Sequence, residues 1–271
     1  MNRWLSVECA TARDAPPGWL GLIAALPGVS LSDLGDVAVG RRLDRKFLIP
    51  EAALGPLLDE AGAAYRVLDV DGTRSQRYQT RYFDTPALRF YFDHHRGKPS
   101  RTKVRLRHYA SGGLVVLEVK RHTGAGLTLK SRHDAVWSRC LGEDERSWLG
   151  AHAIIDAAAL RPVLDNRFER VTLVSAPGTE RATVDTGLIF RRDGARFALP
   201  GVAVLELKGM PGGPDSPLAA ALRRRGVRPS GFSKYCIGMA SLHPQLKQNA
   251  FNVHRRRLAH LVLEDSPCPA A

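Results

Sequence analysis

The chain has 271 residues, of which 44% are hydrophobic and 25% are charged, values typical of a globular protein that buries a core. Forty lysines and arginines against 27 acidic residues give a formal charge of +13, which indicates a polyanionic partner such as nucleic acid, an acidic membrane or condensed phosphate. No apolar run approaches the roughly 20 residues of a membrane span. The four cysteines form no C-x-x-C pair, which argues against a zinc site, and together with a poor secretory signal it favours a cytoplasmic location.

Residues 1–36 are predicted to form an N-terminal extension with one short helix, and its Trp4 and Trp19 are expected to pack on the outside of the fold. A strand over 42–48 places the charged residues Arg42, Asp44 and Lys46 on one face. A helix over 50–64 follows, with a proline at its start. Residues 77–83 predict another strand, and 88–94 an extended segment. The histidine pair at 94–95 lacks further ligands nearby and is expected to be solvated.

The segment 101–108 alternates basic residues with apolar or small ones, which places four cations on one face of a strand: Arg101, Lys103, Arg105 and Arg107. Such a row repels itself unless an anion lies against it. An amphipathic strand with solvated cations explains the same pattern, because charged faces are common on antiparallel sheets. This segment alone therefore leaves both interpretations open.

Further elements follow in chain order. Strands are predicted over 114–120 and 128–132, a helix over 143–159, a hairpin of 167–174 with 181–190, and one long strand over 197–208. Helices are predicted over 217–225 and 232–242, the second with Ser233 as its cap and Lys234 near its N-terminus. The tail, residues 245–271, is basic and is either an amphipathic helix or a frayed terminus.

Alternating charge recurs in these strands, so we expect a sheet with one charged face and one apolar face covered by helices. If that sheet closes on itself, it forms a barrel, so we predict an α+β fold: an antiparallel closed β-barrel with a charged lumen and helices on its outside. A charged lumen requires paired carboxylates, a metal or a bound anion to offset desolvation. Residues 37–244 are expected to form this single domain.

An ordered set of motifs then resembles a known family. The set is Arg42-x-Asp44-x-Lys46, Tyr82-Phe83-Asp84-Thr85, Lys103-x-Arg105-x-Arg107, Glu118-x-Lys120, Phe168-x-Arg170, Arg181-x-Thr183-x-Asp185, Glu206-x-Lys208 and Ser233-Lys234-Tyr235. It is similar to VTC-type polyphosphate polymerase domains of the triphosphate tunnel metalloenzyme superfamily, relatives of the CYTH proteins. The resemblance covers about 41–242 and implies a barrel tunnel, a divalent metal, and ATP with polyphosphate or tripolyphosphate as substrates.

The resemblance also implies roles for single residues. Catalytic cations would be Lys46, Arg105, Arg107, Lys120, Arg170, Arg181 and Lys234; phosphate-binding residues would be Arg42, Lys103, Lys130 and Lys208. Glu206 and Glu118 would be the ligands of Mn²⁺ or Mg²⁺, although Glu118 is equally an outer carboxylate or an ion-pair partner of Lys120. The sequence departs from the family pattern at Asp44, which replaces a glutamate, and at Gly231, which replaces a lysine.

Three functions remain open: a polyphosphate polymerase that uses ATP, a triphosphate hydrolase, and a non-catalytic polyanion-binding module. CYTH-type hydrolases carry Glu-x-Glu-x-Lys on the first strand. Arg42 and Asp44 stand at the two acidic positions here, which favours chain binding over water activation. Nucleic acid is not expected, because the stacking and helix-turn-helix signatures are missing. Any regulatory or membrane-bound partner is expected to be a separate protein.

Overall fold

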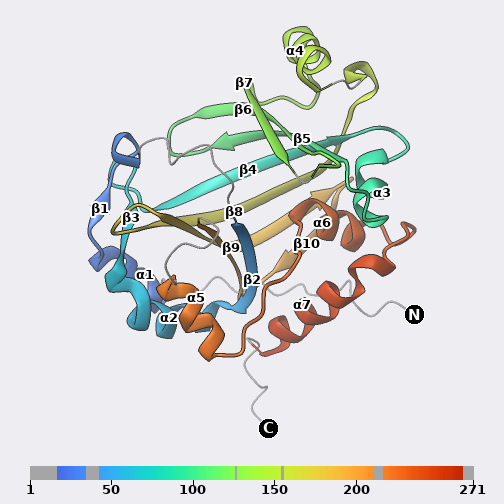
Figure 1. Cartoon of the computed structure of the whole chain (residues 1–271). Helices are drawn as coiled ribbons and strands as arrows, with labels where there is room; N and C mark the ends of the chain where they lie inside the picture. Colours follow the sequence, from blue (N-terminus) through green and yellow to red (C-terminus); the bar gives the residue numbers. More distant parts are fainter. Residues whose placement is uncertain (1–16, 35–42, 126, 154–155, 210–215, 265–271) are drawn as a thin grey trace.

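The computed structural model describes residues 17–34, 43–125, 127–153, 156–209 and 216–264. Within these ranges, eleven strands form one mostly antiparallel sheet with helices around it (Figure 1). The main strand path, in spatial order, is β2 (Leu43–Pro50), β11 (Val202–Gly209), β9 (Glu180–Arg192), β8 (Arg161–Ser175), β4 (Ser75–Asp84), β5 (Arg101–Tyr109), β6 (Leu114–His122) and β7 (Thr128–Asp134). Off this path, β10 (Ala195–Leu199) pairs with β9, while β3 (Tyr65–Leu68) pairs with β8 and, in parallel, with β1 (Gly28–Val29).

The predicted closed barrel is wrong. The strand path begins at β2 and ends at β7, and no hydrogen-bonded pair joins these two strands within the described ranges. Both edges carry cations, Lys46 on β2 and Lys130 with Arg132 on β7. Like charges placed opposite each other destabilise strand pairing, which gives a physical reason for an open sheet. The protein is therefore α+β with a curled, open and mostly antiparallel sheet (Figure 1).

Two hydrophobic cores lie on the sheet. On one side, α1 (Gly18–Ala25), α2 (Leu54–Ala61) and α5 (Pro217–Arg224) cover apolar residues of β2, β8, β9 and β11. Helix α2 turns Leu54, Leu57 and Leu58 toward this core, as its apolar spacing requires. The second core includes side chains from α6 (Lys234–Leu242) and α7 (Asn252–Glu264). The helix predicted in the N-terminal extension is therefore present, and the tail forms a helix with Leu258 and Leu261 buried.

The prediction of an extended segment over 88–94 is wrong, because most of it is helical. The helix is stabilised by Asp84, which precedes it in the chain. The carboxylate of Asp84 accepts hydrogen bonds from the backbone N–H groups of Phe90 (2.9 Å) and Tyr91 (3.0 Å). It thereby caps α3 (Arg89–His95). The same carboxylate accepts a hydrogen bond from the Tyr235 hydroxyl at 2.5 Å, and its burial raises its pKa. Asp84 thus ties α3 to α6.

The predicted strand over 197–208 is two strands, β10 and β11, because Gly201 turns the chain between them at φ +63°. The helix over 143–159 is α4 (Glu143–Ala153) followed by a short 3₁₀ turn. The 3₁₀ turns are η1 (Ser32–Leu34), η2 (Glu51–Ala53), η3 (Gly62–Ala64), η4 (Ala157–Ala159) and η5 (Asn249–Phe251). In the part of the chain that the structure describes, no helix is long and apolar enough to cross a membrane.

Candidate functional site: a cationic face of the sheet

Cross-strand register brings the predicted cations together on one side of the sheet. Lys103 on β5 lies opposite Lys120 on β6, which lies opposite Lys130 on β7. Because directly paired residues project to the same face, these side chains line up. We call the following set the charged face: Asp44, Lys46, Lys103, Arg105, Arg107, Glu118, Lys120, Lys130, Arg132, Arg170, Arg181, Asp185, Glu206, Lys208 and Lys234. Eleven cations thus share a surface with four carboxylates.

Glu118 is the most crowded carboxylate of the charged face. Its oxygens lie 2.6 Å from Arg105, 2.7 Å from Lys130, 3.1 Å from Arg132 and 3.6 Å from Arg107. The residue is 1% exposed. Burial opposes the charged form, but Arg105, Arg107 and Lys130 outweigh it and hold the pKa of Glu118 far below its usual value. The carboxylate therefore stays ionised and organises the cations of the two neighbouring strands, β5 and β7.

A second carboxylate, Asp185 on β9, connects the sheet to α6. It accepts two hydrogen bonds from the Arg170 guanidinium, at 2.5 and 2.7 Å, and also pairs with Lys234. The serine before Lys234 caps the helix. The Lys234 ammonium lies 4.5 Å from the centre of the Phe168 ring, and Arg170 lies 5.0 Å from that of Tyr78. Ion pairs and ring faces together fix these two cations.

Glu206 on β11 is the third acidic centre. Its carboxylate lies 2.9 Å from Lys208 and 3.7 Å from Lys46. Burial opposes ionisation, but these lysines lower its pKa well below the usual value. Asp44 lies 3.7 Å from Lys208, and Arg181 is the partner of Lys208 in the strand register. This cluster therefore holds three cations around two carboxylates at the β2 edge.

Cations in excess of the carboxylates have perturbed pKa values. Burial and neighbouring cations, Lys46 among them, lower the pKa of Lys103 to about 8, although its ammonium donates to the Ser233 hydroxyl at 3.1 Å. Burial and then Lys46 also lower the pKa of Lys120, whose ammonium makes no hydrogen bond or ion pair with any described residue. An anion placed here would relieve this repulsion.

Sequence reasoning missed two members of the charged face. Arg132 binds Glu118, and the spacing of Lys130 and Arg132 two apart on β7 carried that signal. The role of Asp185 as the partner of Arg170 and Lys234 follows only from the register of β8 and β9. Glu118 binds four cations, but no ion pair links it to Lys120 among the described residues. Arg42, a predicted phosphate ligand, lies outside the described residues.

A divalent metal fits one part of the charged face. Mg²⁺ and Mn²⁺ bind through one or two carboxylates together with water and substrate phosphates. Glu206, with two lysine partners, provides such a carboxylate, whereas Glu118 is enclosed by four cations that compete with a metal. No group of three potential metal-binding side chains gathers within the described ranges. His94 lies on α3 with a buried, unpartnered Nε2, and burial with the cations Lys103 and Arg101 lowers its pKa to about 2.

No curated protein matches the chain. Similar solved structures include a putative adenylyl cyclase from Hippeastrum with a dominant triphosphatase activity, at 13% identity and TM-score 0.48, covering 77% of this chain and 99% of that one. A putative adenylate cyclase from Bacillus halodurans has 12% identity and TM-score 0.44, covering 71% and 93%. Because both TM-scores are below 0.5, these likenesses support no statement about function. The VTC domain matches residues 41–243, so the chain belongs to the VTC domain family.

Proposed function

We propose that this protein transfers the terminal phosphate of ATP to a growing polyphosphate chain along the charged face. The observation that carries the proposal is the charge balance of the charged face, where eleven cations accompany only four carboxylates: ten cations lie on strands aligned by register, and Lys234 joins them from α6. Membership of the VTC domain family supports an enzyme acting on condensed phosphates, and we place the chain in the wider triphosphate tunnel superfamily. ATP as the donor suits a cytoplasmic enzyme.

Phosphoryl transfer requires mainly that reactants are held in line and that developing charge is neutralised. The arginines suit bidentate contacts with phosphate oxygens, and the lysines act as point charges. In this proposal the transferred phosphate lies among Lys46, Arg105, Arg107, Lys120, Arg170, Arg181 and Lys234. The polymer lies along Lys103, Lys130 and Lys208; Arg42, outside the described residues, would be a further phosphate-binding residue. Glu206 would hold Mn²⁺ or Mg²⁺, which supplies charge neutralisation at the phosphates.

The carboxylates favour transfer over hydrolysis. A hydrolase benefits from a carboxylate that is free to accept a proton from water, with a pKa near the working pH. Glu118, Asp185 and Glu206 all bind cations, and their pKa values are lowered. They are therefore poor bases. The terminal oxygen of a phosphate chain is already anionic near neutral pH, so it needs no base, only cations that bring two polyanions together.

The proposal is tested by incubating the protein with ATP and Mn²⁺ and separating the products on a gel stained for polyphosphate. We expect ADP and a polymer ladder. Lys120→Gln removes an unpaired cation of the charged face and should shorten or abolish the ladder. Arg256→Gln, at an exposed position of α7, is the matched control and should leave it unchanged. Orthophosphate without polymer would favour the hydrolase, and ATP binding without turnover would favour the polyanion-binding module.

A further inference from the structure

The opposite face of the sheet carries a second cationic site. Strands β4, β8 and β9 place two rows of side chains there: Gln79, Arg167 and Ile189 in one row, and Arg81, Asp165 and Arg191 in the other. Tyr78, Tyr82 and Phe168 alternate with these positions and join the core that contains α6. The six side chains therefore point away from the charged face.

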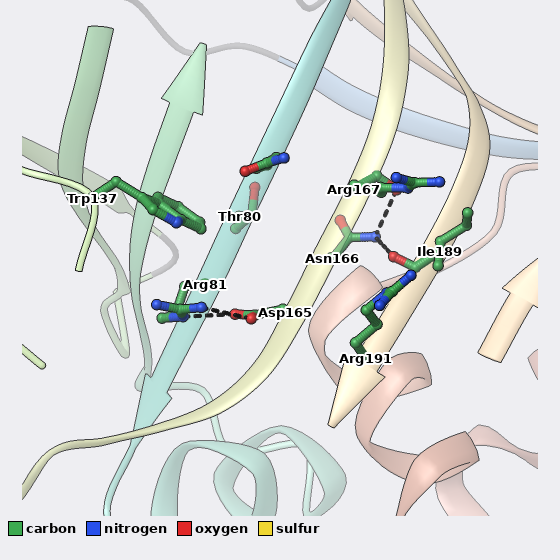
Figure 2. A pocket seen from close by; sticks show the side chains of 9 residues that line it. Thr80, Arg81, Trp137, Asp165, Asn166, Arg167, Ile189 and Arg191 are labelled. Atoms are coloured by element: carbon green, nitrogen blue, oxygen red, sulfur yellow. Dashed lines mark hydrogen bonds and ion pairs between the residues drawn. The ribbon is translucent and has the colours of Figure 1, made fainter. Parts of the chain in front are cut away.

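These rows line a cavity of about 320 Å³, which Trp137 borders from the segment after β7 (Figure 2). We call it the arginine pocket; its lining is completed by Thr80 and Asn166. Its volume lies at the lower end of the roughly 300–1,000 Å³ typical of small-molecule sites. The pocket is thus large enough for more than a single inorganic ion.

One of the three arginines is already neutralised. Arg81 donates to both carboxylate oxygens of Asp165, at 2.8 and 2.7 Å, and to the carbonyl oxygen of Ser138 at 2.7 Å. Its guanidinium carbon lies 4.9 Å from the centre of the Trp137 ring. Figure 2 shows the Arg81–Asp165 pair side by side on neighbouring strands. This pair with Trp137 forms a fixed wall with no spare charge.

The other two arginines are not neutralised. Arg167 and Arg191 are exposed, and neither guanidinium group makes a hydrogen bond or ion pair with any residue that the structure describes. Asn166, buried beside them, donates to the carbonyl oxygens of Ile189 (3.2 Å) and Arg167 (3.4 Å). These bonds hold the backbone from which the pocket side chains project (Figure 2). Two guanidinium groups on a fixed backbone therefore border the pocket without a counter-charge.

We propose that the arginine pocket binds a small organic phosphate, separately from the charged face. Two unneutralised guanidinium groups match the charge of one phosphate monoester dianion, and each offers paired N–H donors to its oxygens. Ile189 and Trp137 provide apolar surface for the carbon part of the ligand. Free phosphate would fill only the cationic part of the pocket, so the organic part of the ligand should add affinity.

The test follows the Trp137 indole N–H signal in a ¹⁵N NMR titration of the full chain, assigned through Trp137→Phe. The probes are AMP, adenosine and inorganic phosphate. We expect a saturable shift with AMP, a weaker response to phosphate and none to adenosine. The double variant Arg167→Gln/Arg191→Gln, at exposed positions, should need at least about tenfold more AMP, since two charge-assisted contacts are lost.

Two controls separate this site from the charged face. Arg256→Gln lowers the net charge elsewhere, and Lys120→Gln weakens the charged face; both should titrate like the wild type. The proposal would be overturned if AMP did not shift the Trp137 signal, if the double variant titrated like the wild type, or if AMP and adenosine gave equal responses. Loss of the response in Lys120→Gln would overturn it too, because AMP would then act from the charged face. None of these readouts requires enzymatic activity.

Discussion

Glu118→Gln is the substitution that most sharply tests how the charged face is held together. Glutamine keeps the shape of the side chain but removes the charge that four cations share at 2.6 to 3.6 Å. Glu118 is 1% exposed and the side chains of its partners Arg107 and Arg105 are 8% and 23% exposed, so water solvates these two cations poorly once the carboxylate charge is lost. Breaking a buried ion pair by removing one partner costs roughly 3–5 kcal/mol. At about 2–4 °C per kcal/mol, we expect the melting temperature to fall by roughly 10 °C.

A bound polyanion should repair much of this loss. Tripolyphosphate supplies negative charge to the same cations, and a ligand at 100 times its Kd stabilises the folded state by about 2.7 kcal/mol. The stabilisation should be larger in Glu118→Gln than in the wild type. In the folded protein the pKa of Glu118 lies below its ordinary value of 4.5. Its contribution to stability is therefore fully present above pH 4.5 and is lost as the pH falls toward the folded pKa. The difference between the two proteins should therefore shrink in acid.

The assay is thermal unfolding with and without tripolyphosphate, with sulfate at equal ionic strength as the salt control. Glu169→Gln is the matched variant, because Glu169 pairs with Arg77 at a site where the side chains are 39% and 64% exposed. An exposed pair contributes about 0–1 kcal/mol. Equal losses in the two variants, or equal stabilisation by sulfate and tripolyphosphate, would refute the reasoning.

Three further predictions concern the metal, the protons and the packing. Glu206→Gln should lower Mn²⁺-dependent ADP release at least about tenfold yet destabilise less than Glu118→Gln, and unchanged release would place the metal elsewhere. Lys103, with a pKa of about 8, should take up protons when tripolyphosphate binds at pH 8; calorimetry in buffers of different ionisation enthalpy detects this, and identical heats would contradict it. Gly238→Ala would place a Cβ 2.6 Å from the Phe190 ring and should lower the free energy of unfolding in urea by about 1–3 kcal/mol. Gly150→Ala, where a Cβ meets open space, is the control. A Gly238→Ala protein as stable as the Gly150→Ala protein would refute the packing argument.

Local alternation in the sequence predicted the charged strands well, because side-chain direction in a strand depends only on a period of two. The segment around Arg105 and the pair Glu206 and Lys208 lie in strands β5 and β11 as expected. Closure of the sheet could not be predicted in the same way. It depends on whether two edges far apart in sequence meet, and β2 and β7 form no hydrogen-bonded pair among the residues that the structure describes.

Other features required long-range geometry. The helix at 89–95 depends on Asp84, the last residue of β4, whose carboxylate accepts from the backbone of the helix. The pairing of Asp185 with Lys234 joins β9 to α6 across 49 residues. The arginine pocket draws its cations from three strands whose register no local pattern reveals. In each case the chemistry is visible in the sequence only after the neighbours are known.

The most direct test of the proposed transfer is the stoichiometry of the reaction. ATP labelled at its γ-phosphate is incubated with the protein and Mn²⁺, and the label is counted in polymer and in orthophosphate as ADP accumulates. Transfer to a chain predicts that each ADP is matched by one labelled phosphate in acid-insoluble polymer, with little orthophosphate. One labelled orthophosphate per ADP, with no label in polymer, would contradict the account and establish hydrolysis.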